Sequence, residues 1–446
     1  MAGEWTTATV AELQRDGVLL VEDGNHGEYR PRPDEFVESG VAFIRAADMD
    51  GGRVLFGSAS KINSRARQRI TKGIGAPGDV LLSHKGTVGK VALVPSDAPA
   101  FVCSPQTTFW RTRDTDRMDR QYLYAYLRSP SFHAQLATRA GETDMAPYVS
   151  LTSQRGLSVT FPPIHAQRAI ANILGTLDDK IELNQRMSET LESIARALFK
   201  SWFVDFDPVR AKAEGRDPGI PKPLADLFPA RLVDSAFGKI PEGWNAKPLG
   251  QWVDALSGGT PSKSEGHYWD GDVPWISPKV MTGIHADQAD EHVSELAIKS
   301  GTRIAPALST LIMVRGMGLH EFVRVSQARR DVTFNQDVKA LVGTSIDATL
   351  LLFALLDAQP TLLERVESSG HGTGKLPSEV LFALPIAMPD PTTQLRLASP
   401  LRVLNDRIAS SRAESRILNE LRDTLLPKLT TGELRMPEIA ASTAVA

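Results

Sequence analysis

The chain has 446 residues, of which 42% are hydrophobic and 23% are charged, and its formal net charge at pH 7 is −3. This length and hydrophobic content allow two to four domains with real cores and exclude a disordered chain. The acidic balance argues against a protein that binds nucleic acid over its whole surface, so any nucleic-acid contact would be confined to local basic patches.

The single cysteine, Cys103, excludes internal disulfides and cysteine-rich metal sites, and it fits a reducing compartment. The first residues show neither a basic n-region nor an apolar h-region, and the sequence contains no run of about 18 apolar residues. We therefore expect a cytoplasmic protein with no membrane contact.

Residues 1–162 are expected to form a first domain of the α+β class. Its opening segment, Trp5 to Leu20, suggests a short helix or turn, and helical signals follow at 121–127 and 131–138. Short strands between Gly, Pro and Asp turns are expected at 41–45, 80–83, 88–94, 101–108 and 157–159.

Residues 163–203 predict one long helix, because apolar residues recur there in alternating steps of four and three. The expected pairing positions are Ile170, Leu177, Ile181, Asn184, Ser188, Leu191 and Leu198, with the two polar residues at the middle. Such a helix is about 60 Å long at about 1.5 Å per residue, so it needs a partner helix.

The partner lies in the same chain, because the pattern recurs 227 positions later, in residues 390–430. The second set of pairing positions includes Leu404, Ile408, Ser411, Ser415, Leu418 and Leu425. A pseudo-twofold relation would place the two polar centres opposite each other, so we expect antiparallel pairing. The expected neighbours are Asn184 with Ser415, Ser188 with Ser411, Ile181 with Leu418, and Leu191 with Ile408.

The repeat extends upstream, where Val80–Gly86 matches Thr310–Gly316 at an offset of 230 and Val41–Ile44 resembles Val273–Ile276 at an offset of 232. Only sparse positions agree, and the loops between them differ. A shared scaffold with divergent loops is typical of two recognition modules of different specificity. Duplication of one domain for stability is the alternative.

Residues 204–243 are rich in Pro, Gly and charge and are expected to form a linker. The second domain should occupy 244–389, with a flexible tail at 431–446. Its expected elements are strands at 273–277, 311–315 and 332–337 and a helix at 347–366. The predicted fold is thus α+β, with two pseudo-repeated domains joined by two long helices that pair as an antiparallel coiled coil.

Basic residues cluster in both domains and fit contacts to phosphates, although solvated surface is the alternative reading of any charge run. The DNA-binding candidates are Arg65, Arg67, Arg69, Lys72 and Lys85 in the first domain and Arg303, Arg315, Arg324 and Arg330 in the second. Lys85 and Arg315 occupy matched positions, which favours phosphate contact or a scaffold role over base reading.

Sequence motifs for catalysis or metal binding are incomplete. The G-x-G-x-x-G run at 73–78 leads into a strand-like segment instead of a helix, and the H-E start at His320 lacks its second histidine. Gly374-Lys375 lacks the first glycine of a phosphate-binding loop. The pair Asp178-Asp179 is expected on a solvated helix face, so neither catalytic residues nor metal ligands are predicted.

Two long matched helices, each preceded by a divergent domain, resemble the specificity subunit of type I restriction-modification enzymes. The resemblance covers nearly the whole chain and is strongest at 78–82 with 86–89, at 162–167 and at 198–208. The second copy departs from the pattern at Ser309-Thr310 and at Met317–Leu319, which leaves its turn geometry open.

The resemblance implies a chain without catalytic activity, in which each domain reads one half of a split, asymmetric site in double-stranded DNA. It also implies that the helices set the spacer and dock two methylation subunits, which bind S-adenosylmethionine. Two restriction subunits using ATP and Mg²⁺ would complete the complex, so no cofactor is expected in this chain. The rival readings are a coiled-coil scaffold with two protein-binding ends and a self-sufficient modification enzyme.

Overall fold

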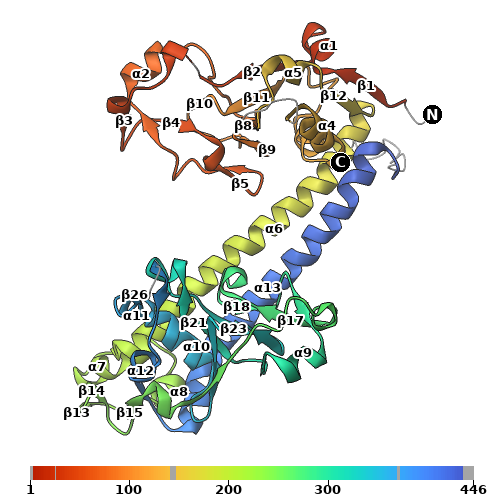
Figure 1. The fold of residues 1–446 in the computed structure, drawn as a ribbon. Coiled ribbons are helices and arrows are strands. Elements are labelled where there is room, and N and C mark those ends of the chain that lie inside the picture. The colour runs from red at the N-terminus through yellow and green to blue at the C-terminus, as the bar shows by residue number, and fades with distance from the viewer. Residues whose placement is uncertain (1–3, 26, 141–146, 369–371, 435–446) are drawn as a thin grey trace, which may run out of the picture. The chain divides into compact units, whose positions relative to one another are not determined.

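The computed structural model describes residues 4–25, 27–140, 147–368 and 372–434 (Figure 1). The chain divides into two compact units, residues 1–182 with 415–446 and residues 183–414. Each unit therefore contains one domain together with one half of each long helix. Most of the expected tail, residues 435–446, lies outside the described residues.

The first unit is built on a six-stranded sheet in the order β2-β11-β8-β9-β6-β5 and a four-stranded sheet in the order β10-β4-β7-β3. A small sheet pairs β1 with β12. The strands are β1 Thr6–Thr9, β2 Leu19–Asp23, β3 Phe36–Val37, β4 Val41–Ile44, β5 Met49–Asp50, β6 Arg53–Val54, β7 Lys61–Ile62, β8 Val80–Lys85, β9 Thr87–Leu93, β10 Phe101–Cys103, β11 Thr107–Thr112 and β12 Ser158–Phe161. The short helices are α1 Val10–Arg15, α2 Ser64–Arg69, α3 Arg120–Leu127, α4 Pro130–Ala140 and α5 Leu151–Arg155.

The opening segment contains the expected short helix, α1, but Thr6–Thr9 before it form a strand along Ser158–Phe161. Thr9 then caps α1 through a capping box with Glu12, so the helix begins only at Val10. The expected strand at 101–108 is in fact two strands, β10 and β11, which belong to different sheets.

The second unit contains the sheets β16-β25-β21-β23-β18 and β19-β17-β24-β20, with smaller sheets β13-β14, β15-β28 and β22-β27-β26. The strands are β13 Leu232–Ser235, β14 Gly238–Pro241, β15 Asn245–Pro248, β16 Val253–Ser257, β17 Val273–Ile276, β18 His285–Ala286, β19 His292–Val293, β20 Ile304–Ala305, β21 Thr310–Met313, β22 Arg315–Gly316, β23 Val325–Ala328, β24 Val332–Phe334, β25 Val338–Gly343, β26 Glu367–Ser368, β27 Gly374–Lys375 and β28 Pro385–Met388. The short helices are α7 Asp207–Ala213, α8 Lys222–Ala225, α9 Glu295–Ser300, α10 Ala348–Asp357, α11 Gln359–Leu363 and α12 Ser378–Phe382.

Two expected elements of the second unit are interrupted. The strand at 332–337 ends at Phe334, where the Asn335 side chain accepts a hydrogen bond from the backbone N–H of Asp337 and turns the chain. The helix at 347–366 breaks between α10 and α11, in front of Pro360, which supplies no backbone N–H to continue the hydrogen-bond ladder.

The internal repeat extends to sheet topology. The central strands β2, β11, β8 and β9 of the first unit have β16, β25, β21 and β23 at the same places in the second. The parallel pair β10-β4 likewise corresponds to the parallel pair β24-β17. The fold is therefore α+β with two pseudo-repeated domains, as the sequence predicted.

The long helices are α6 Ile164–Phe199, followed by a π-helical turn at Lys200–Val204, and α13 Pro391–Thr431. In the first unit, Ile170 and Leu174 of α6 share a core with Leu426 and Leu429 of α13. In the second unit, Ala195 and Phe199 share a core with Leu397, Leu401 and Ile408. Early α6 meets late α13 and late α6 meets early α13, so the helices pair antiparallel.

The segment expected as a linker contributes to the core of the second unit. Phe206, Val209 and Phe228 are buried in the same cluster as Trp244. Their burial explains why α7, α8 and the β13-β14 hairpin form here despite the many Pro and Gly residues. Within the described ranges, no helix has the length and apolar character that a membrane span requires.

Candidate nucleic-acid interface and helix contacts

Four of the basic candidates of the first unit lie on α2 or just after it. Asn63 caps this helix by accepting a hydrogen bond from the backbone N–H of Ala66, and Ala66 and Ile70 anchor it in the core. The buried side thus leaves Arg65 and Lys72 exposed and Arg67 half-buried. These cations are presented by a short anchored helix.

Arg69, the fourth candidate, is engaged inside the protein. Its guanidinium forms two hydrogen bonds to the Glu35 carboxylate, of 2.6 and 2.5 Å, and donates to the carbonyl of Arg30 at 3.1 Å. The Arg69 hydrogen bonds lower the pKa of Glu35 to about 2. Arg69 therefore fixes the loop around Glu35 to α2, and its charge is largely compensated.

Lys85 lies apart from α2 in the chain fold, at the end of β8, where the strand turns through Gly86 into β9. Gly86 adopts a φ of 77°, which favours glycine and makes the tight turn possible. Lys85 is exposed and pairs across an isolated antiparallel bridge with Tyr148, whose ring centroid lies 5.6 Å from Nζ.

In the second unit the four candidates come from different elements. Arg315 is exposed on β22 and is paired in register with Lys375 of β27. Arg324 is half-buried, donates to the carbonyl of Met281 at 2.7 Å and stacks on Phe322. Arg303 and Arg330 are exposed and flank the short β20-β24 ladder.

Tyr148 and Lys375 are positions at the hairpin tips that the sequence reasoning missed. Both follow from the repeat, because they are 227 positions apart, the same offset that relates the two long helices. Their signal was weak because the two residue types differ, and only the backbone pairing shows that they occupy the same place.

The helix-pairing positions lie on the inner faces of α6 and α13. Those that are buried are Ile170, Ile181, Asn184, Ser188, Ile408 and Ser411. Those that are half-buried are Leu177, Leu191, Leu198, Leu404, Ser415, Leu418 and Leu425. By contrast, Leu183 and Val403, which fall outside the repeating pattern, are 58% and 66% exposed.

The polar groups at the centre of the helix pair are only partly satisfied, because the side-chain oxygen of Asn184 is buried without a hydrogen-bond partner in the described structure. Asn184 donates a hydrogen bond of 2.8 Å to the carboxylate of Glu414. The Ser188 and Ser411 hydroxyls donate to carbonyls one turn earlier in their own helices, at 2.8 and 2.9 Å. A buried amide paired with a single carboxylate favours one register of the helices over others.

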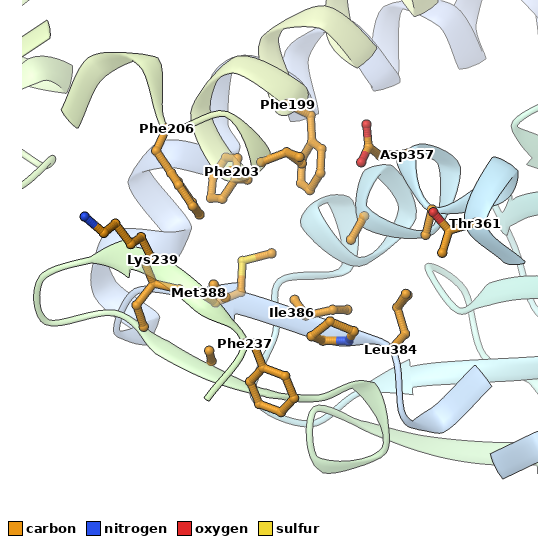
Figure 2. A pocket seen from close by; sticks show the side chains of 17 residues that line it. Phe199, Phe203, Phe206, Phe237, Lys239, Asp357, Thr361, Leu384, Ile386 and Met388 are labelled. Carbon is orange, nitrogen blue, oxygen red and sulfur yellow. The ribbon is translucent and has the colours of Figure 1, made fainter. Parts of the chain in front are cut away.

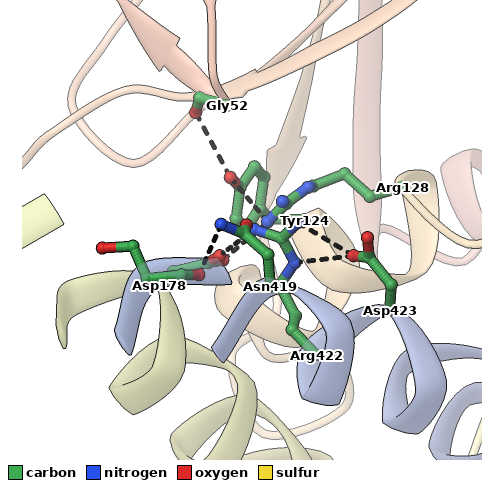
Figure 3. A network of polar contacts seen from close by, with 8 residues as sticks. Gly52, Tyr124, Arg128, Asp178, Asn419, Arg422 and Asp423 are labelled. Carbon is green, nitrogen blue, oxygen red and sulfur yellow. Dashed lines mark hydrogen bonds and ion pairs between the residues drawn. The ribbon is translucent and has the colours of Figure 1, made fainter. Parts of the chain in front are cut away.

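Asp178 was expected on a solvated face, and that expectation is wrong. Figure 3 shows it between two arginines: Arg128 of α3's end donates to one carboxylate oxygen at 2.6 Å and Arg422 of α13 to the other at 2.9 Å. Arg128 also donates to the hydroxyl of Tyr124, which in turn donates to the carbonyl of Gly52. This network fastens both long helices of the first unit to its domain.

Each long helix is fastened near its start by one glutamine, and the two glutamines are related by the repeat. Gln167 accepts from the backbone N–H of Asp119 at 2.9 Å and donates to the carbonyls of Arg117 and Pro162. Gln394 makes the matching hydrogen bonds, accepting from Asp347 and donating to the carbonyls of Ser345 and Pro389. Asp119 and Asp347 cap α3 and α10, so each glutamine links a long helix to the corresponding domain helix.

A second buried polar chain holds α13 to the sheet of the second unit. Asn405 donates to the side-chain oxygen of Gln327 at 2.9 Å, so its own oxygen is left to accept from Nε2 of His285, 2.8 Å away. Nδ1 of His285 is buried with no hydrogen-bond partner in the described structure. Burial therefore lowers the pKa of His285 to about 4.

A cavity of about 400 Å³ lies beside the π-helical turn of the second unit (Figure 2). Phe199, Phe203 and Phe206 form much of its apolar wall, and the carboxyl group of Asp357 and the ammonium group of Lys239 also line it. Burial raises the pKa of Asp357.

The histidines and acidic residues that the structure describes do not gather into a metal-binding cluster. The features that recur in both units are instead exposed cations on a repeated scaffold and buried clamps to the long helices.

Known proteins share this organisation. The family model described as the type I restriction modification DNA specificity domain matches residues 26–193 and 241–421, one match for each half of the chain. The chain is 27% identical over 447 residues to the specificity subunit of type I restriction enzyme HindI from Haemophilus influenzae, covering 88% of this chain and 94% of that protein. It is 25% identical over 385 residues to the MjaIX specificity subunit of Methanocaldococcus jannaschii, covering 84% of each.

The fold agrees with a solved structure. The crystal structure of the S subunit of a type I restriction-modification system from M. genitalium superimposes with a TM-score of 0.61 at 15% identity, covering 98% of this chain and 97% of that one. With the family model matching both repeats over most of the chain, the protein belongs to the family of type I restriction modification DNA specificity domains.

Proposed function

We propose that this chain is the DNA-recognition subunit of a type I restriction-modification complex, and that each of its two domains reads one half of a bipartite, asymmetric site. The observation that carries the proposal is the family match to both halves of a chain whose two domains share one topology. Shared strands with different exposed side chains are what two readers of different half-sites require.

In this proposal the candidates fall into two classes of contact. The exposed candidates are Arg65 on α2, Lys72 just after it, and Arg303 and Arg330 beside the β20-β24 ladder. Arg67 on α2 is half-buried. We assign these five side chains to contacts with DNA. Arginine can bind guanine through two hydrogen bonds in the major groove, whereas lysine mostly neutralises phosphate. Arg69 and Arg324 already bond within the protein and would position neighbouring loops.

The antiparallel helices α6 and α13 would set the spacer between the half-sites and dock two methylation subunits. We assign the chemistry to partner chains: methyl transfer from S-adenosylmethionine to the methylation subunits, and ATP- and Mg²⁺-dependent steps to two restriction subunits. The chain itself would then be non-catalytic. Support for this division comes from the specificity subunits to which the chain is similar.

A domain exchange tests the proposal. Replacing residues 1–162 by the corresponding domain of a relative, in the full complex, should change one half of the methylated site and leave the other half unchanged. The readout is a genome-wide map of methylated bases. A change in both half-sites, or in neither, would contradict the assignment of one half-site to each domain.

Methyl transfer by purified components tests the division of labour. The chain alone should transfer no methyl groups, and activity should appear only when its methylation subunit is added. Methylation by the chain alone would show that it carries its own active site.

A further inference from the structure

Both units present a cation at the tip of a matched hairpin, and each cation faces one side chain on a neighbouring segment. Lys85 is paired in register with Tyr148 in the first unit, and Arg315 with Lys375 in the second. The facing residues Tyr148 and Lys375 are 227 positions apart. Two sites of the same geometry therefore exist, one in each unit.

The backbone around the two sites is also matched. The N–H of Val149 donates to the carbonyl of His84 at 2.9 Å, and the N–H of Leu376 donates to the carbonyl of Val314 at 2.9 Å. In each case the residue after the facing side chain bonds to the residue before the cation. The pairing is thus held by the scaffold and does not depend on which side chains occupy it.

In the second unit the paired side chains carry the same charge. Arg315 and Lys375 are directly opposite each other on antiparallel strands, where side chains share one face and Cβ atoms lie about 4.5–5.5 Å apart. Like charges in this position are destabilising. Glu367 flanks Lys375 on its other side, but neither Arg315 nor Lys375 forms an ion pair within the described residues. The three side chains Arg315, Lys375 and Glu367 together keep one net positive charge, which an anion bound between the two cations would neutralise.

The site of the first unit carries one charge and one hydroxyl. Lys85 is exposed beside the half-buried Tyr148 ring, with Nζ 5.6 Å from the ring centroid. Burial, and after it the nearby Asp23 carboxylate, raises the pKa of Tyr148, so its hydroxyl stays protonated and can donate a hydrogen bond. An ammonium group next to a phenol is a donor pair suited to a phosphate oxygen.

We propose that each unit holds one backbone phosphate of DNA at this bridge, between Lys85 and Tyr148 in the first unit and between Arg315 and Lys375 in the second. The proposal rests on the proposed function and deepens it, because it separates contacts that position the DNA from contacts that read it. Phosphate contacts carry no base information. The two bridges would therefore serve the same purpose in both half-sites, while the loops that differ between the units select the sequence.

The test uses the full chain in complex with its methylation subunits and four variants: Lys85→Met, Tyr148→Phe, Lys375→Met and, as a control, Lys239→Met on β14, outside both hairpins. Affinity is measured for target and non-target duplexes at several salt concentrations. Lys85→Met and Lys375→Met should each weaken binding to both duplexes by a similar factor and reduce the slope of log affinity against log salt by about 1. Tyr148→Phe should weaken both with an unchanged slope, because no charge is lost.

Thermal unfolding gives an independent readout. Lys375→Met removes both the repulsion from Arg315 and the attraction to Glu367 on the other side, so the unfolding midpoint should stay close to that of the wild type while DNA affinity falls. The Lys239→Met control should match the wild type in both measurements.

Unchanged salt slopes in Lys85→Met and Lys375→Met, with normal binding by the wild-type complex, would overturn the proposal. Loss of affinity for the target duplex only would also overturn it, because that result indicates base reading. If the wild-type complex shows no salt-dependent DNA binding, the proposed function itself fails, and the two failures are thus distinguishable.

Discussion

Individual side chains in this protein take their roles from partners far away in the sequence. Asp178 bridges arginines 50 positions before it and 244 positions after it. His285 is held by Asn405, 120 positions later. Both residues look ordinary in the sequence, and both are structural clamps between a domain and a long helix.

Replacing Asp178 by Asn should destabilise the first unit. The side chain is 25% exposed and its carboxylate pairs with both Arg128 and Arg422 in the network of Figure 3, where Asp423 pairs with Arg422 as well. Loss of that charge leaves two partly buried guanidinium groups facing each other, so we expect the free energy of unfolding to fall by about 1–3 kcal/mol. Denaturant titration measures it. The control is Asp179→Asn at the exposed neighbouring position, which should change the free energy of unfolding by less than about 0.5 kcal/mol.

The second unit should lose stability as the pH falls from about 6.5 to about 4. The ordinary pKa of His285 is 6.5 and burial lowers it to about 4 in the folded chain, so the unfolded chain binds more protons in that range. The neutral ring contributes its stability above pH 6.5, and on the order of 3 kcal/mol is lost once the pH has fallen through both values. The measurement is the unfolding midpoint against pH.

The variant His285→Gln supplies the control for this pH dependence. Glutamine can still donate to the oxygen of Asn405 but does not titrate. Its unfolding midpoint should change less between pH 6.5 and pH 4 than that of the wild type. Parallel pH profiles for the two proteins would show that another group is responsible.

At the scale of elements, the spacing of apolar residues decides which face of each long helix is buried. Leu397, Leu401 and Ile408 of α13 are fully buried, whereas Val403 between them is 66% exposed. Steps of four and three residues place Leu397, Leu401 and Ile408 on one face of the helix, and Val403 falls on the opposite face. Burial along α13 can therefore be tested one residue at a time.

Leu401→Ala should cost about 2–5 kcal/mol of unfolding free energy, because it removes buried methyl groups and leaves a cavity in the core of the second unit. Val403→Ala removes a similar amount of side chain from the exposed face and should stay within about 0.5 kcal/mol of the wild type. Chemical denaturation of both variants provides the comparison. Equal losses would place both positions in the same environment and contradict the helix pairing.

At the scale of the whole molecule, two copies of one topology are each joined to the halves of two long helices. The matched glutamines Gln167 and Gln394 make equivalent hydrogen bonds at the start of each helix, so both domains are attached to their helices in the same way. If the helices set the spacer of the DNA site, their length should determine the distance between the half-sites.

Seven residues inserted at the middle of both α6 and α13 should lengthen the spacer. One heptad adds about 10 Å of helix, which corresponds to about three base pairs, while the repeat of the pairing face is preserved. The half-site sequences should stay unchanged in a map of methylated bases. The same insertion in α6 alone is the control, and it should abolish methylation because it shifts the Asn184–Glu414 register.

Local patterns in the sequence determined the elements that repeat regularly. The seam of α6 and α13 follows from periodicity among neighbouring residues. The offset of 227 between the helices and the α+β class with two related domains follow from the self-similarity of the sequence, which is visible without any knowledge of contacts. The positions of the Lys and Arg candidates are likewise read directly from the sequence.

Contacts between distant segments were decided only by the tertiary structure. The strand β1, the split of residues 101–108 between two sheets and the burial of the supposed linker depend on partners that no local pattern identifies. The same holds for Asp178, for Arg69 with Glu35, and for Tyr148 and Lys375 at the hairpin tips. Whether a charge faces water, a counter-ion or an opposing cation depends on the residue across from it, and folding alone brings that residue near.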